Sequence, residues 1–188
     1  MERAPGIRER VIDTCSRLFY DQGYLATHIN QITAEAGISK SGLYQHFKSK
    51  EDLLSEYLTH AGKKWFDGLN ELLVDCQSPA EILLTFFDYR KQLAETDKFK
   101  GCAFLRLVYE LPALDERAYT VIRRHKQLVK TLMFNQVQLL EPATYVTARK
   151  ELTELIYTLF EGCGVESSLQ RSVKPIEESK AIVKRLIF

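Results

Sequence analysis

The chain has 188 residues, of which 45% are hydrophobic and 27% charged, so it is long and apolar enough to fold around a sizeable core. Its formal net charge of +1 excludes the general basic field of a nonspecific nucleic-acid-binding protein. No apolar run approaches the roughly 20 residues of a membrane span, no secretory signal opens the chain, and the four cysteines form no C-x-x-C pair; we therefore expect a cytoplasmic protein with no membrane association, disulfide framework, metal or other cofactor.

Helical periodicity dominates the first half of the chain, and glycine and serine mark its interruptions. Residues 7–21 form an amphipathic pattern that ends at Gly23, and a short second helix is stopped by Gly37. Ser39 can cap a third helix that runs to about Phe47. Ser49 and Asp52 then form a capping box, which predicts a long fourth helix.

The second half continues in helices. Ser78-Pro79 predicts a helix start, with serine as the cap and proline in the first helical position. Four further helices are predicted over residues 102–111, 115–140, 146–170 and 176–187. No segment has the alternation and turn residues of a hairpin, and no period of about 20–50 residues repeats. The prediction is an all-α fold of about nine helices.

Residues 29–47 have the spacing of a helix-turn-helix, with Gly37 at the turn. The third helix begins with Lys40, Ser41 and Gly42 and has no acidic residue in its first turn, whereas the fourth begins with two acids. A positive amino end with small and hydroxyl side chains suits close approach to an anionic duplex. This chemistry favours DNA binding over a helical protein-binding module, which has no reason to assemble it.

A family resemblance rests on four stretches, residues 19–24, 27–32, 36–47 and 49–54. They resemble the signature of TetR (tetracycline-repressor-like) transcriptional regulators almost throughout; His28 and Thr33 are the two departures. The resemblance implies a DNA-binding domain over residues 1–50 and a helical ligand-binding and dimerisation domain over 51–188. It also implies a homodimer that binds a palindromic double-stranded operator, acts by default as a repressor, and is released by a small effector.

The resemblance assigns the candidate DNA contacts residue by residue. Positions that commonly touch phosphates correspond to Thr27, Tyr44 and Lys50. Residues that face the groove correspond to Ser39, Lys40, Ser41, Gln45 and His46, with Gly42 beside them. The competing interpretation is that Tyr44 and His46 pack within the domain and that the lysines are merely solvated.

The effector is expected to be small and either largely apolar or electrophilic, because residues 101–105 and 171–177 resemble TetR regulators that sense such molecules. The helices that usually surround the ligand cavity carry the candidate pocket residues Trp65, Phe86, Phe87, Tyr89, Cys102, Phe104 and Tyr109. Cys102 is either a reactive sensor thiol at a helix start or an ordinary small apolar residue. His125, in a run of cations, is expected to be solvated.

The last two predicted helices carry broad apolar stripes, which on composition alone indicate core more often than interface. The resemblance reverses that preference, because these helices usually form a four-helix dimer interface. The candidate interface residues are Leu152, Ile156, Leu159, Phe160, Gly162, Cys163, Ile182 and Leu186. Gly162 and Gly164 indicate either close helix approach or a kink. No enzyme motif of the metalloprotease, nucleophile-elbow or phosphate-loop type occurs, so catalysis is not expected.

Overall fold

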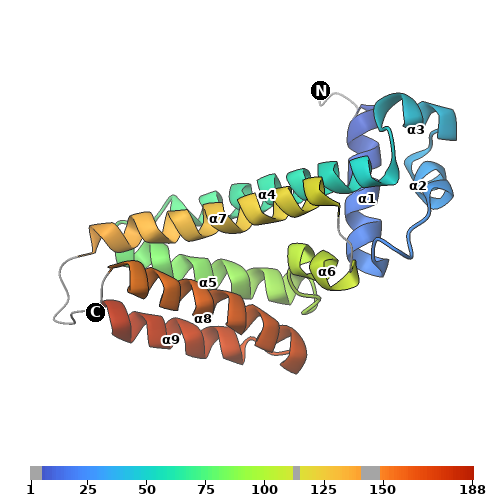
Figure 1. Cartoon of the computed structure of the whole chain (residues 1–188). Helices are drawn as coiled ribbons and strands as arrows, with labels where there is room; N and C mark the ends of the chain where they lie inside the picture. Colours follow the sequence, from blue (N-terminus) through green and yellow to red (C-terminus); the bar gives the residue numbers. More distant parts are fainter. Residues whose placement is uncertain (1–5, 112–114, 141–148) are drawn as a thin grey trace. The chain divides into compact units, whose positions relative to one another are not determined.

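The computed structural model describes residues 6–111, 115–140 and 149–188. In these ranges it has no strand and nine helices: α1 (Ile7–Gln22), α2 (Ile29–Ala36), α3 (Lys40–His46), α4 (Lys50–Leu73), α5 (Pro79–Thr96), α6 (Ala103–Glu110), α7 (Glu116–Leu139), α8 (Arg149–Gln170) and α9 (Lys174–Ile187) (Figure 1). The predicted all-α class is confirmed. The predicted start of a helix at residue 146 lies outside the described residues.

Local side-chain caps set several helix starts. The Ser39 hydroxyl accepts a hydrogen bond from the Gly42 amide, and the Ser78 hydroxyl accepts one from the Glu81 amide. Ser49 accepts from the Asp52 amide, while the Asp52 carboxylate reaches back to the amide of Lys48. Each bond satisfies an amide that has no partner within its helix, so short-range sequence chemistry determines these boundaries.

The chain divides into two compact units. One contains residues 1–64 and 103–124, and the other contains 65–102 and 125–188, so α4 and α7 each contribute to both. The first unit extends past residue 50 because α4 supplies part of its core. Phe19 of α1, for example, meets the α4 residue Tyr57 edge to face, with ring centroids 5.4 Å apart.

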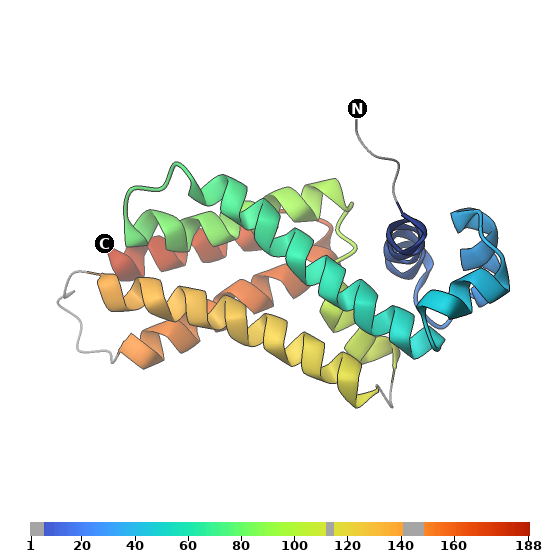
Figure 2. The ribbon, with the colours of Figure 1, turned by 90° about the horizontal axis from the view of Figure 1, so that it is seen from above.

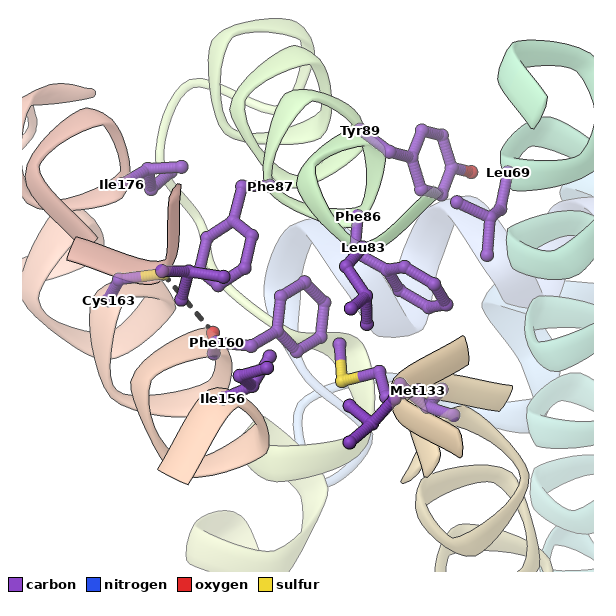
Figure 3. Packing of buried hydrophobic residues seen from close by; sticks show 13 residues of the cluster. Leu69, Leu83, Phe86, Phe87, Tyr89, Met133, Ile156, Phe160, Cys163 and Ile176 are labelled. Atoms are coloured by element: carbon purple, nitrogen blue, oxygen red, sulfur yellow. Dashed lines mark hydrogen bonds between the residues drawn. The ribbon is translucent and has the colours of Figure 1, made fainter. Parts of the chain in front are cut away.

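The second unit packs α5, α8 and α9 together around an aromatic centre (Figures 1 and 2). Phe160 of α8 points between Phe86 and Phe87 of α5, with ring centroids 6.0 and 5.6 Å away in edge-to-face geometry (Figure 3). Such pairs add about 0.5–1.5 kcal/mol beyond the burial of their area. The ring of Phe160 is therefore central to this core.

Three of the predicted interface residues belong to that core. Ile156, Phe160 and Cys163 are at most 4% exposed, and Figure 3 places them among the side chains of α5 and α9. A second copy of the chain cannot reach side chains that the first copy already covers. The structure therefore assigns these three residues to packing within the chain, and an interface on α8 requires its other face.

Candidate nucleic-acid interface

The helix-turn-helix is made by α2, the three-residue turn 37–39 that begins with Gly37, and α3. Gly37 adopts φ 65° and ψ 42°, a left-handed conformation that strains residues with a Cβ. Its amide and the amide of Ile38 both bond back to the end of α2, the latter to the Thr33 carbonyl at 3.0 Å. This C-cap ends α2 sharply and fixes the direction in which α3 leaves.

One face of α3 is locked into the protein and the other is open. Leu43 is fully buried and Phe47, directly after the helix, is 1% exposed. The predicted groove-facing side chains and Tyr44 are all exposed: Ser39, Lys40, Ser41, Tyr44, Gln45 and His46. Gly42 lies half-buried between them, where its amide is used by the Ser39 cap. A rigid helix thus presents hydroxyl, amide, imidazole and ammonium groups to the outside.

Thr27 is buried, whereas a residue that contacts a phosphate is expected to be exposed. Its side chain is fully buried, and its hydroxyl donates to the Gly23 carbonyl at 2.6 Å and accepts from Gln22 Nε2 at 3.1 Å. Since a hydroxyl has only one proton to donate, Thr27 has no side-chain donor left for a phosphate. Its observed role is to hold the turn between α1 and α2. The departure His28 makes no side-chain cap at α2.

Lys50 is half-buried and points back toward the same turn. Its ammonium donates to the Tyr24 carbonyl at 2.6 Å and lies 4.1 Å from the centroid of the Tyr24 ring. Burial lowers the pKa of Lys50, while the nearby Glu110 and Glu51 carboxylates oppose that shift. An ammonium has three donors, so one used by Tyr24 leaves two for an approaching phosphate.

Two α6 residues that sequence reasoning missed contact the end of α1 and the turn that precedes α2. The Glu110 carboxylate accepts from the amides of Tyr24 and Leu25 at 3.1 and 2.7 Å. One helical turn earlier, the Arg106 guanidinium donates to the Tyr20 carbonyl at 2.6 Å. The spacing of four residues puts both side chains on one face of α6, but nothing local in the sequence indicates that this face meets a segment 86 residues away.

The predicted pocket residues divide between the two compact units. Trp65, Phe86, Phe87, Tyr89 and Cys102 belong to the second unit, whereas Phe104 and Tyr109 belong to the first. Tyr109 is 78% exposed and Phe104 is buried. Within the second unit, the Trp65 ring lies 5.4 Å from Tyr89 and 6.4 Å from Phe86, so these three predicted residues do come together.

His125 joins the same aromatic group, which corrects the expectation that it is solvated. It is only 7% exposed, and its ring lies 5.3 Å from that of Trp65 and 5.2 Å from that of Phe66. Burial, with the adjacent Lys126 ammonium, lowers the pKa of His125 to about 4. The imidazole is consequently neutral at physiological pH.

Cys102 lies half-buried just before α6, with the Lys126 ammonium 3.6 Å from its sulfur. Cys15 and Cys163 are buried, and burial raises the pKa of their thiols to about 12 and about 11, which suppresses the thiolate. Cys76 is half-buried near the end of α4, where its sulfur contacts the Thr85 hydroxyl. Of the four cysteines, only Cys102 has a cation within contact distance of the sulfur among the contacts described.

An apolar stripe runs along the face of α8 that the core does not use. Leu155, Val165 and Leu169 are 44, 51 and 77% exposed, and their spacing of ten and four residues keeps them on one side of the helix. Gly162 lies on this stripe with open space around it, whereas a Cβ on Gly164 would collide with the Arg90 guanidinium. Leu152, Leu159 and Leu186 are half-buried and Ile182 is exposed.

None of the described helices is long and apolar enough to cross a membrane. The part of the chain that the structure describes also holds no cluster of three or more side chains able to bind a metal ion.

Comparison with known proteins decides the family. Residues 11–57, which contain the helix-turn-helix, match the family described as bacterial regulatory proteins of the tetR family. Over 169 residues the chain is 30% identical to the HTH-type transcriptional regulator YxaF of Bacillus subtilis, covering 89% of this chain and 87% of the relative. The chain belongs to the TetR family. It is therefore a helix-turn-helix transcriptional regulator, of a family whose members bind DNA and dimerise.

More distant relatives match over nearly the full length of the chain. The chain is 21% identical over 183 residues to IcaR of Staphylococcus epidermidis, a negative transcriptional regulator of a biofilm operon, with 97% of this chain and 95% of IcaR covered. The crystal structure of reduced NemR from Escherichia coli superimposes with a TM-score of 0.82 at 21% identity, covering 97% of this chain and 98% of NemR. The latter similarity establishes the fold alone.

Proposed function

We propose that this TetR-family protein is a repressor that binds a palindromic operator as a homodimer and is released by a small-molecule effector. The observation that carries the proposal is the open face of α3: Lys40, Ser41, Gln45 and their exposed neighbours stand on a helix whose opposite face, at Leu43, is fully buried. A rigid helix with exposed donors is the element that reads base edges in a major groove. Repression is supported by relatives named as repressors.

Within this proposal, Lys40, Ser41, Gln45 and His46 face the groove, and Tyr44 and Lys50 contact phosphates. Lys50 contributes through the donors that Tyr24 leaves unused. Thr27 acts indirectly, by holding the turn before α2. The DNA-binding part is assigned to residues 1–50 and the effector-binding and dimerisation part to 51–188.

Operator binding is tested by fluorescence anisotropy on a palindrome selected from random DNA. Two half-sites about 34–36 Å apart, or a multiple of that spacing, are expected. Lys50→Ala should weaken binding on every sequence and lower the salt slope by about one, whereas Gln45→Ala should change base preference. Lys64→Ala is the matched control, because this exposed α4 lysine lies about 21 Å further along the same helix. Absence of any palindrome preference would contradict the proposal.

The homodimer is proposed to form through the exposed face of α8 and the neighbouring face of α9. Leu155, Gly162, Val165 and Leu169 supply the α8 side, in continuity with the predicted Leu152 and Leu159. Ile182 and Leu186 supply the α9 side. Gly162 lets the second helix approach closely, because no atom of the described residues lies within 4 Å of the position that a Cβ would take there.

The effector is proposed to bind the second compact unit beside Trp65 and Phe86, and to favour the conformation that does not fit the operator. A ligand that binds both conformations equally well shifts nothing, so release requires this difference in affinity. Cys102 is proposed to be an ordinary packing residue that forms no covalent bond with the effector. If so, wild-type protein and Cys102→Ser should respond alike to every inducer; release of the wild type alone by electrophiles or oxidants would overturn this assignment.

A further inference from the structure

We propose that the effector of this protein carries a negative charge on an aromatic or otherwise flat apolar body, and that Arg90 and Lys126 bind the charge. The inference rests on the proposed function, because it specifies the ligand class of the same effector site. It is carried by a cluster of charged side chains in the second unit, formed by Arg90 of α5, Lys126 of α7 and Glu161 of α8.

The three charges do not balance. The Glu161 carboxylate contacts both cations, with one oxygen 2.6 Å from Lys126 Nζ and the other 3.5 Å from an Arg90 Nη atom. Two cations thus share one anion, while the neighbouring pair of Lys130 and Glu154 is balanced by itself. The cluster carries a net charge of +1.

Neither of the neighbouring titratable side chains His125 and Tyr157 supplies the missing negative charge. The pKa of His125 is lowered by burial to about 4, so its imidazole is neutral. Burial likewise raises the pKa of Tyr157, so its phenol stays protonated. Lys126 also contacts Cys102, whose sulfur accepts a hydrogen bond from Lys126 Nζ at 3.6 Å.

The Arg90 guanidinium is incompletely satisfied. Its buried Nε makes no hydrogen bond within the part of the chain that the structure describes. Its Cζ atom lies 3.6 Å from the centroid of the Phe160 ring, a cation–π contact that holds the group without neutralising it. Because an uncompensated buried charge is destabilising, such an excess is more often found at functional sites than in ordinary packing.

The cluster is accessible and stands beside an aromatic wall. The side chains of Arg90, Lys126 and Glu161 retain 14, 16 and 19% exposure, so the cluster is not fully sealed from solvent, although Arg90 Nε itself is buried. The Phe160 ring that Arg90 contacts packs against Phe86, whose ring lies 6.4 Å from that of Trp65. A ligand with an anionic end and a flat apolar end would therefore meet charge and aromatic surface together, as small-molecule sites usually require.

The competing carboxylate makes the proposal sharply testable. An incoming anion takes the place of Glu161 beside Arg90 and Lys126, so Glu161 opposes binding while the two cations support it. Arg90→Gln and Lys126→Met should each weaken binding of an anionic ligand about tenfold or more. Glu161→Gln should strengthen it, because the amide no longer competes for the cations. Lys130→Met, one turn along α7 and in a balanced pair, should leave affinity unchanged.

The probes are aromatic carboxylates of increasing size, from benzoate and para-tert-butylbenzoate to anthracene carboxylate, each paired with its neutral amide. Calorimetry measures the affinity. A change in the fluorescence of Trp65, the single tryptophan, shows that the ligand binds near that residue. Each carboxylate should bind at least about tenfold more tightly than its amide. The proposal is overturned if no carboxylate exceeds its amide, if acetate binds as tightly as the aromatic acids, or if Glu161→Gln and Arg90→Gln change affinity in the same direction.

Thermal melting of each variant separates loss of fold from loss of binding, and Lys126→Met tests the same charge if Arg90→Gln fails to fold. Operator binding without ligand is measured alongside. A protein that binds a palindrome but does not prefer anionic probes contradicts this inference and leaves the proposed function intact. A protein that prefers the anions but binds no palindrome contradicts the proposed function alone.

Discussion

His125 illustrates how a single residue can combine packing with a pH response. The sequence places it among Arg123, Arg124 and Lys126, where a solvated cation is the natural interpretation. The structure turns it inward against Trp65 and Phe66, and burial keeps it neutral. A neutral imidazole in this position is compatible with the nearby cations Lys126 and Arg90, whereas an imidazolium would add a third positive charge.

This burial predicts a loss of stability in mild acid. Below its ordinary pKa near 6.5 the unfolded chain binds a proton at His125 that the folded protein, with a pKa of about 4, does not. Stability is therefore present above pH 6.5 and falls as the pH drops toward 4, by about 3 kcal/mol in total. Denaturant titrations of wild type and His125→Phe across this window should show a shallower dependence in the variant. If stability depends equally on pH in the wild type and in His125→Phe, protonation of His125 does not cause the loss of stability in acid.

The burial of His125 was predictable from a signal other than local charge. It lies on the α7 face that also carries Ile122, Val129 and Met133, all at most 4% exposed and separated by helical spacing. The roles of Thr27 and Lys50 could not be predicted from helical periodicity. Their hydrogen-bond partners, the carbonyls of Gly23 and Tyr24, belong to a turn whose path depends on tertiary packing.

At the scale of elements, α6 contributes to the DNA-binding unit although the sequence places it far from the helix-turn-helix. Glu110 caps two amides of the turn that leads into α2, and Arg106 holds the end of α1. Gly23, in the same turn, has φ 94°, and a Cβ there would lie 2.9 Å from the Glu110 carboxylate. The turn and α6 are therefore fitted closely to each other.

Removal of this contact should loosen the turn without unfolding the unit. Glu110→Ala should lower the protection of the Tyr24 and Leu25 amides by about 1–3 kcal/mol, because each loses a charged acceptor. Hydrogen exchange followed by NMR measures both amides directly. Glu110→Gln keeps one carbonyl oxygen and should have a smaller effect, and Glu116→Ala, an exposed carboxylate of α7, is the control. Unchanged exchange in Glu110→Ala would show that the contact does not hold the turn.

Most helix boundaries could be predicted because they depend on neighbours within four residues. Ser39, Ser49 and Ser78 cap where their sequence context indicates. The side on which α8 packs could not be predicted. Both of its faces are apolar, so periodicity alone does not distinguish the face that α5 covers, at Phe160, from the face left open, at Val165.

At the scale of the whole molecule, the proposed function requires two DNA-reading helices to be paired, and the exposed face of α8 is the surface proposed to pair them. A palindromic site is read by two symmetry-related copies, since each copy supplies one α3. The exposed apolar side chains Leu155, Val165 and Leu169 are the type of surface that a second copy covers. If a dimer buries these three side chains, the free-energy cost of their exposure to water is removed.

Two substitutions on α8 distinguish interface from core. Val165→Glu places a charge on the open face, where the monomer tolerates it but a dimer must bury it unpaired at a cost of several kcal/mol. The variant should therefore melt as a folded monomer and lose operator affinity. Phe160→Glu places the same charge among Phe86 and Phe87 and should instead unfold the second unit. Sedimentation equilibrium and thermal melting separate the outcomes. A wild-type protein that is monomeric at micromolar concentration would refute the homodimer, and a Val165→Glu variant that remains dimeric would place the interface elsewhere.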